Sequence, residues 1–152
     1  MKNILVKHTS FLFLLLLFSA GCKVTFIPDY DKDIAAQIDN TAKMVDRFYL
    51  EMLETPDGDY LRAYNFYSEE YINIEVELNS LLYKNKVRPL NENSVRICEI
   101  TLQLWIKYKE EHKQDDKLSN GLIKLNRVSF ADLFFAMQSA EKAKEIIINP
   151  PQ

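Results

Sequence analysis

The residues that most strongly oppose helix formation are confined to a few places in this chain. After the first 30 residues, proline occurs only at positions 56, 89, 150 and 151, and glycine only at positions 58 and 121. Inside a helix, glycine costs about 1 kcal/mol and proline about 3 kcal/mol. Stretches that exclude both residues therefore favour helices, and they form four segments, near 30–55, 58–87, 90–118 and 119–148.

Each segment also repeats apolar side chains at steps of three and four residues, which places them on one face of a helix. Asp, Asn or Ser residues that can cap a helix precede the segments, at positions 29 and 31, 57 and 59, 91 and 93, and 119 and 120. Four amphipathic helices with short connections predict an all-α fold, an antiparallel up-down-up-down four-helix bundle over residues 31–148. The four faces are Ile34, Ile38, Ala42, Val45, Tyr49 and Met52; Tyr60, Tyr64, Tyr67, Tyr71, Ile74, Leu78 and Leu81; Val95, Cys98, Leu102 and Trp105; and Leu122, Phe130, Leu133, Met137 and Ala140.

The second segment contains a local conflict between helix and strand. Ile72, Ile74, Val76 and Leu78 alternate with polar residues, as in a half-buried strand. The heptad spacing of the tyrosine row, however, continues through this stretch, and no turn residue flanks it. We therefore expect a helix. Its apolar row could form the contact surface of a homodimer as well as part of the core.

The first 21 residues have the layout of a cleaved signal peptide. Lys2 and Lys7 precede the apolar run Phe11–Phe18, and the small residues Ser19–Gly21 lead to Cys22. A membrane-spanning helix needs about 20 apolar residues, so this run is too short to be one. The alternative to a lipoprotein signal is an ordinary secretory signal that happens to be followed by a cysteine.

The segment from Ser19 to Lys23 resembles the lipobox of bacterial lipoproteins, although Ser19 replaces the commoner aliphatic residue. The resemblance implies cleavage before Cys22, a covalent lipid such as palmitate on that residue, and a lipid-anchored tether over 22–30. The leader and the stretch from Tyr71 to Asn93 are similar to small lipoproteins of Bacteroidota. That likeness implies an envelope location and no known activity.

Two features after Cys22 bear on which membrane holds the anchor. Lys23 occupies the place where, in the enterobacterial pattern, aspartate marks retention in the inner membrane. The following residues, 24–27, lack the acidic tract of lipoproteins that are exported to the cell surface. The expected location is therefore the periplasmic face of the outer membrane.

Composition argues against several classes of function. The net charge of −3 becomes more negative once Lys2 and Lys7 are removed, which gives no basis for binding nucleic acid. His8 lies in the leader, so His112 is the one histidine of the mature chain, and a multi-histidine metal site is not expected. No haem, phosphate-loop or nucleophile-elbow motif occurs. We expect no enzyme, no catalytic residue, no metal and no cofactor besides the lipid.

The tyrosine row is the first candidate for a binding surface. Tyr60, Tyr64, Tyr67 and Tyr71 would rise along one helix and could line a groove for a peptide, glycan or aromatic ligand. The competing interpretation is a wide end of the core, filled by rings whose hydroxyls reach solvent. Glu70 and Glu77 flank this row, and a solvated face is the simpler interpretation than an acid–base pair.

Arg88 is the second candidate, because it lies in the loop 87–93 and could bind a carboxylate or phosphate. The alternative is a Pro-Asn turn that caps the next helix. Cys98 falls on an apolar face and is expected to be a small buried residue rather than a reactive thiol. Trp105 is expected to anchor the core. His112, next to two glutamates, is expected to be exposed near a helix end.

The sequence therefore predicts a membrane-anchored envelope lipoprotein that acts as a non-enzymatic protein-interaction or structural module. Its expected partners are the membrane, through the lipid on Cys22, and another envelope protein. The alternative function is a small-ligand or peptide binder with an aromatic pocket between the helices, at Tyr60, Tyr64, Tyr67 and Tyr71.

Overall fold

The computed structural model describes residues 27–148, except for the side chains of residues 146–148. Within this range the chain forms helices and no strand. The long helices are α2 (Lys32–Glu54), α3 (Ser68–Lys86), α4 (Glu92–Asp115) and α5 (Asn120–Ile148), and two short 3₁₀ helices, η1 (Tyr60–Arg62) and η2 (Tyr64–Phe66), precede α3. The expected signal peptide, the lipid-bearing Cys22 and tether residues 22–26 lie outside the described residues.

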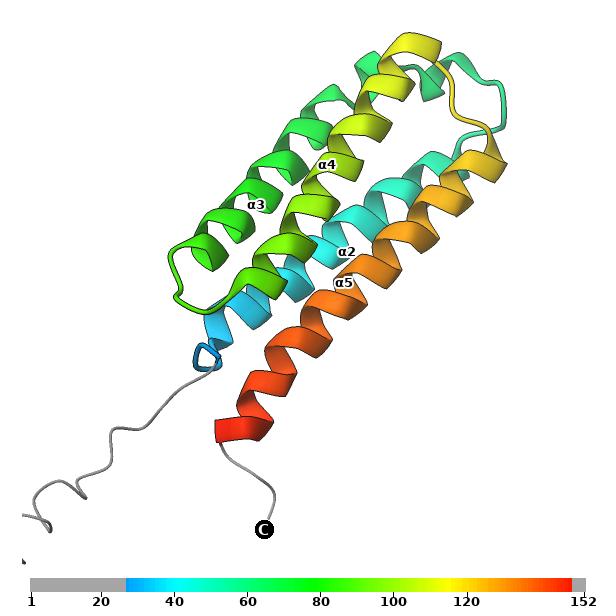
Figure 1. Cartoon of the computed structure of the whole chain (residues 1–152). Coiled ribbons are helices and arrows are strands. Elements are labelled where there is room, and N and C mark those ends of the chain that lie inside the picture. The colour runs from blue at the N-terminus through cyan, green and yellow to red at the C-terminus, as the bar shows by residue number, and fades with distance from the viewer. Residues whose placement is uncertain (1–26, 149–152) are drawn as a thin grey trace, which may run out of the picture.

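The four long helices lie side by side, and each packs against two others. α2 contacts α5 and α3, and α4 contacts α3 and α5. Figure 1 shows the turn between α3 and α4 at the end of the molecule where α2 begins. The connections from α2 to α3 and from α4 to α5 lie together at the opposite end (Figure 1).

The apolar face predicted for the first segment is buried as expected. Ile34, Ile38, Val45, Tyr49 and Met52 are all at most 2% exposed. The helix begins where the sequence indicates, because the carboxylate of Asp31 accepts hydrogen bonds from the backbone N–H groups of Asp33 and Ile34. This cap satisfies two of the amide groups that a helix N-terminus leaves without a partner.

The second segment is only partly the helix that was predicted. Tyr71–Leu78 is helical, so the interpretation as a strand is wrong. The helix, however, begins at Ser68 and not near residue 58, because Ala63 takes an extended conformation with ψ 148°. Residues 60–66 instead form the two 3₁₀ turns η1 and η2, which carry the chain across the end of the bundle. The tyrosine row is therefore not one continuous helical face.

The core is aromatic at its centre and is built by all four long helices. Trp105 on α4 is fully buried, as predicted, and its ring lies 5.2 Å from that of Phe48 on α2 and 5.4 Å from that of Phe130 on α5, measured between centroids. Tyr71 on α3 completes the group, 5.1 Å from Trp105. On α5 one predicted core position is wrong, since Leu122 is 46% exposed and its neighbour Ile123 is buried instead.

Candidate functional site

The four tyrosines of the predicted binding row are distributed over two turns and a helix, and they differ sharply in exposure. Tyr60 is 75% exposed and packs against Phe66, whereas Tyr71 is completely buried. Tyr64 stacks on Tyr71 with ring centroids 5.6 Å apart, and Tyr67 meets Phe48 edge-on at 5.8 Å. The buried end of the row thus fills the core with aromatic rings.

Tyr71 forms a buried hydrogen-bonded chain with His112 of α4 and the backbone of η1. Nε2–H of His112 donates to the carbonyl oxygen of Arg62 at 2.8 Å, which leaves Nδ1 to accept from the Tyr71 hydroxyl at 3.1 Å. Burial lowers the pKa of His112 and raises that of Tyr71, so both rings are neutral near pH 7. The prediction that His112 is exposed is therefore wrong.

The step from Trp105 to His112 shows why His112 turns inward. Cys98, Thr101, Trp105 and His112 are all buried, at spacings of three, four and seven residues, so His112 continues the inner face of α4. The charged residues on either side of it obscure this periodicity in the sequence.

Arg62 is buried although nothing in the sequence singled it out. Its guanidinium donates to the backbone carbonyls of Thr55 and Leu118 and, at 2.7 Å, to the side-chain oxygen of Asn120. It also lies 3.4 Å from the carboxylate of Asp57. One side chain thus joins the end of α2, the η1 turn and the connection between α4 and α5.

Arg88, the second predicted site residue, binds a carboxylate of this same chain. Its guanidinium nitrogens lie 3.2–3.3 Å from the oxygens of Glu141 on α5, and it also donates to the backbone carbonyl of Asp29. Its side chain is only 13% exposed. Glu141 additionally accepts from the backbone N–H of Asp31 at 2.9 Å, so the start of α2, the α3–α4 turn and α5 meet at one carboxylate.

The same carboxylate is paired with a buried lysine. Lys144 donates to Glu141 at 2.6 Å, to the side-chain oxygen of Asn91 at 2.9 Å and to Ser94 Oγ at 3.0 Å. Burial lowers the pKa of Lys144, and the hydrogen bond to Glu141 opposes that shift. The side chain of Asn91 donates in turn to Asn85 instead of capping α4.

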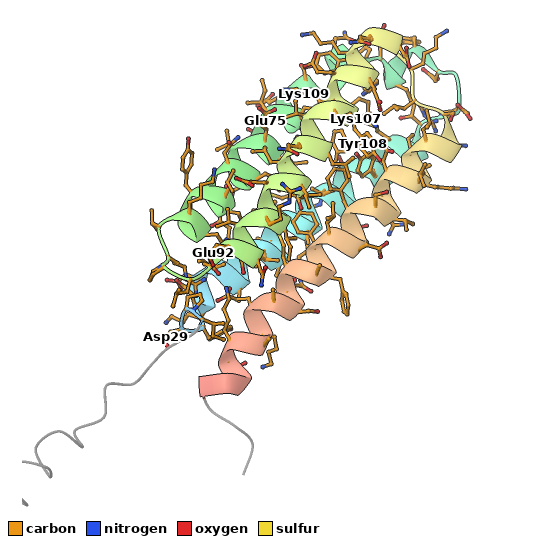
Figure 2. All side chains as sticks on the ribbon, in the orientation of Figure 1. Asp29, Glu75, Glu92, Lys107, Tyr108 and Lys109 are labelled. Atoms are coloured by element: carbon orange, nitrogen blue, oxygen red, sulfur yellow. The ribbon has the colours of Figure 1, made fainter. Side chains whose placement is uncertain are left out.

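The remaining candidate residues are accounted for by contacts within the chain. Cys98 is buried, and burial raises the pKa of its thiol to about 11, as befits a packed side chain. Glu77 accepts a hydrogen bond from Gln37, and Glu70 is exposed. Figure 2 shows Glu75 of α3 beside Lys109 of α4, and these two side chains are 2.6 Å apart.

An open groove runs between α2 and α5 on the outside of the bundle. It encloses about 760 Å³, and Leu50, Phe130, Ala131, Phe134 and Phe135 form its apolar floor and walls. Phe135 is 71% exposed and extends the apolar surface of the groove toward solvent. Charged side chains form the rim: Lys43, Asp46, Arg47, Glu51, Glu54 and Arg127.

Comparison of the chain with protein-family models, curated proteins and solved structures found no match. Over residues 27–148 no three histidine, cysteine or acidic side chains are grouped so that they could hold a metal ion. In the same part of the chain, no helix combines the length and the apolar character needed to cross a membrane.

Proposed function

We propose that this protein is a lipid-anchored envelope lipoprotein that acts as a non-enzymatic protein-interaction module. The proposal includes cleavage of residues 1–21, a lipid on Cys22, and an up-down-up-down bundle, which the positions of the three connections support. The observation that carries the interaction role is the groove between α2 and α5, with the exposed Phe135 at its edge.

The groove fits an amphipathic helix of another envelope protein. Its apolar floor would take apolar side chains that recur at steps of three and four residues along such a helix, as in helix-in-groove recognition. The rim offers both signs of charge, and two of its basic residues are already paired within the chain. Nε of Arg127 lies 2.6 Å from the carboxylate of Asp46, and Lys43 pairs with Asp39. Arg47, Glu51 and Glu54 are then the side chains that would set the orientation of the partner.

The alternative function, a small-ligand or peptide binder at the tyrosine row, has less support. It requires a pocket of about 300 Å³ or more with converging polar groups. The hydroxyl of Tyr71, the innermost member of the row, is already bonded to His112, and the rings of Tyr64 and Tyr71 are stacked. We therefore place the interaction at the groove.

Anchoring is tested with Cys22→Ser in the full chain, expressed in a bacterium with a lipoprotein pathway. Fatty-acid labelling of the protein should be lost, and the protein should move from the membrane to the soluble fraction. Cys98→Ser serves as the matched control, because Cys98 is buried and should keep both labelling and membrane attachment. Labelling that is unchanged in Cys22→Ser would contradict the proposed anchor.

The interaction role is tested by placing a photo-crosslinking amino acid at Leu50, in the groove, and at Ile100, on α4. These two side chains are similarly exposed, at 40% and 38%. We expect an adduct with a second envelope protein from position 50 only, and we expect Phe135→Ser to abolish it. Equal adducts from both positions, or none from position 50, would refute the groove as the binding site.

A further inference from the structure

The turn between α3 and α4 presents three apolar side chains to solvent. Val87 and Leu90 are 81% and 51% exposed, and Pro89 between them is exposed as well. Single exposed apolar side chains are common on protein surfaces, whereas clusters of them mark contact surfaces. This turn is therefore a candidate contact surface at one end of the bundle.

Leu90 also has an unusual backbone conformation. Its φ angle is 58°, in the left-handed region that glycine and asparagine occupy more readily than leucine. A leucine here gives the turn neither a relaxed backbone nor a buried side chain. Its presence therefore points to a contact outside the chain.

The same turn lies against the segment that leads from Cys22 into α2. Arg88 donates a hydrogen bond to the backbone carbonyl of Asp29. A hollow of about 420 Å³ lies between the two segments, and its apolar lining residues are Ile27, Pro28, Tyr30, Pro89 and Leu90. The apolar surface of the turn thus extends to the place where the tether meets the bundle.

The proposed lipid anchor would hold this end of the bundle close to the bilayer. Ile27 follows Cys22 by five residues, which span at most about 18 Å. Figure 1 shows the α3–α4 turn at the end where α2 begins, and the α2–α3 connection at the opposite end. Helix α2 has 23 residues and is about 34 Å long, so the opposite end lies about that much further from the tether.

A lipid surface suits the side chains that this turn leaves free. Its two basic residues are already paired within the chain, Lys86 with Glu99 and Arg88 with Glu141. The groups left for a contact are the apolar ones, which need no partner of matching charge. An anchored lipid keeps the bilayer within reach at all times, so contact with it is an intramolecular step at a high effective concentration.

We propose that the α3–α4 turn inserts Val87 and Leu90 into the lipid surface beside the anchor. The proposal rests on the lipid at Cys22, because two side chains expose too little apolar surface to hold a protein on a bilayer, where even one acyl chain is marginal. The turn adds orientation to the attachment. It directs the α2–α3 connection away from the membrane and leaves the α2–α5 groove on the side of the bundle, open to a partner.

The test locates both ends of the bundle relative to the bilayer in the mature, lipidated protein. The protein is produced in a bacterium with a lipoprotein pathway and reconstituted in vesicles of phosphatidylethanolamine and phosphatidylglycerol. A fluorophore on Asn93→Cys, beside the turn, is compared with one on Asn65→Cys, in η2 at the opposite end. Both asparagines are exposed, and Cys98→Ser in every variant keeps the fluorophore off the second thiol.

A lipid with a nitroxide on its head group should quench the fluorophore at position 93 and not the one at position 65. Mass spectrometry of the same protein shows whether Cys22 carries its lipid, so the two proposals fail in different ways. Equal quenching at both positions in a lipidated chain would overturn the membrane contact and leave the anchor intact. A chain without the lipid would contradict both.

Replacing Leu90 separates insertion from mere nearness to the membrane. Leu90→Asn removes the apolar side chain and suits the left-handed backbone, so the fold should be retained. The ratio of inserted to free turn should fall about fivefold, as expected when about half of a leucine side chain loses its apolar contact. Leu61→Asn, at a similarly exposed leucine of η1, should leave the quenching at position 93 unchanged.

Circular dichroism of each variant confirms that the helices are retained. Two more results would overturn the proposal. One is quenching at position 93 that Leu90→Asn does not change. The other is a photo-crosslinking amino acid at Val87 that joins the turn to one particular protein in intact cells, because a protein would then cover the turn in place of lipid.

Discussion

At the scale of single residues, two buried polar side chains stabilise the end of the bundle where two connections meet. Arg62 satisfies the carbonyls of Thr55 and Leu118, and the carbonyl of Arg62 itself accepts from His112. A buried carbonyl without a partner costs free energy comparable to a lost hydrogen bond. These side chains therefore replace the backbone hydrogen bonds that the connections cannot form.

Replacing Arg62 with methionine should lower the free energy of unfolding by about 2–4 kcal/mol. Methionine fills much of the same volume but leaves the buried carbonyl of Leu118 without its donor, at about 1–3 kcal/mol, while the partly buried Thr55 carbonyl and Asn120 can turn to water at a smaller cost. Urea denaturation followed by circular dichroism measures the change. Arg96→Met, at an exposed position of α4, should stay within about 0.5 kcal/mol of the unsubstituted protein. Equal effects of the two substitutions would contradict the role of Arg62.

His112 should make the stability depend on pH. Burial holds the pKa of His112 below its usual value near 6.5, although the hydrogen bond to the Arg62 carbonyl and the charge of Asp116 oppose this shift, so the folded state prefers the neutral ring. The stabilisation is therefore complete above pH 6.5 and is lost as the pH falls toward the lower folded-state pKa. Protonation of Nδ1 would also remove the acceptor for the Tyr71 hydroxyl.

The measurement is urea denaturation between pH 7.5 and 5, above the range where most carboxylates titrate. The free energy of unfolding should fall by up to about 1.4 kcal/mol per pH unit, the limit for one proton. In His112→Gln the dependence should flatten, even if the protein is less stable overall. A slope that is the same in both proteins would refute the assignment to His112.

At the scale of helices, the inner face of α5 changes from apolar to charged along its length. Phe130, Phe134 and Met137 pack in the core, and Glu141 and Lys144 continue the same face at steps of four and three. These two residues meet the start of α2 and the α3–α4 turn through Asp31 and Arg88. The charged end of α5 therefore helps to fix where α2 begins, where α3 ends and where α4 begins.

Glu141→Gln should destabilise the protein by about 3–5 kcal/mol, because it leaves Lys144 and Arg88 as buried or half-buried cations without a carboxylate. Glu141→Gln combined with Lys144→Met removes one of these cations and should recover part of the loss. Thermal and urea unfolding measure both variants, and Glu145→Gln, one turn further at the surface, is the control. A double variant less stable than Glu141→Gln alone would contradict this explanation.

The sequence predicts α2, α4 and α5 to within about three residues at each end, because proline, glycine and apolar periodicity act locally. It fails at residues 58–67, where nothing local opposes a helix. There the deciding contacts of Arg62 come from residues far away in the chain, such as Leu118 and Asn120. Arg88 was found as a candidate, but Glu141, its partner 53 residues away, was not.

The apolar periodicity of α4 and α5 does indicate some of the buried polar residues. The spacing that places Trp105 inside also places His112 inside, and the spacing of Phe130 and Met137 continues to Glu141 and Lys144. Periodicity alone does not predict a buried charge, because burial of a charge is costly unless it is paired. The pairing depends on the tertiary structure, and no single helix reveals it.

At the scale of the whole molecule, the four long helices share one aromatic centre. Trp105 lies within 6.3 Å, between ring centroids, of Phe48 and Tyr49 on α2, Tyr71 on α3 and Phe130 on α5. Its indole N–H also donates to the backbone carbonyl of Tyr71 at 3.1 Å. No helix can separate from the others without changing the surroundings of this ring.

We therefore expect the bundle to unfold in one cooperative step that Trp105 reports. The fluorescence of Trp105, the one tryptophan of the chain, and the helical circular dichroism signal should give the same midpoint and slope in urea. In a Trp105→Phe chain that carries Tyr60→Trp, the new ring sits in the exposed η1 turn, and its emission should change little on unfolding. Separate midpoints for fluorescence and circular dichroism in the unsubstituted chain would mean that one helix leaves before the rest. The shared aromatic centre would then not hold all four helices together.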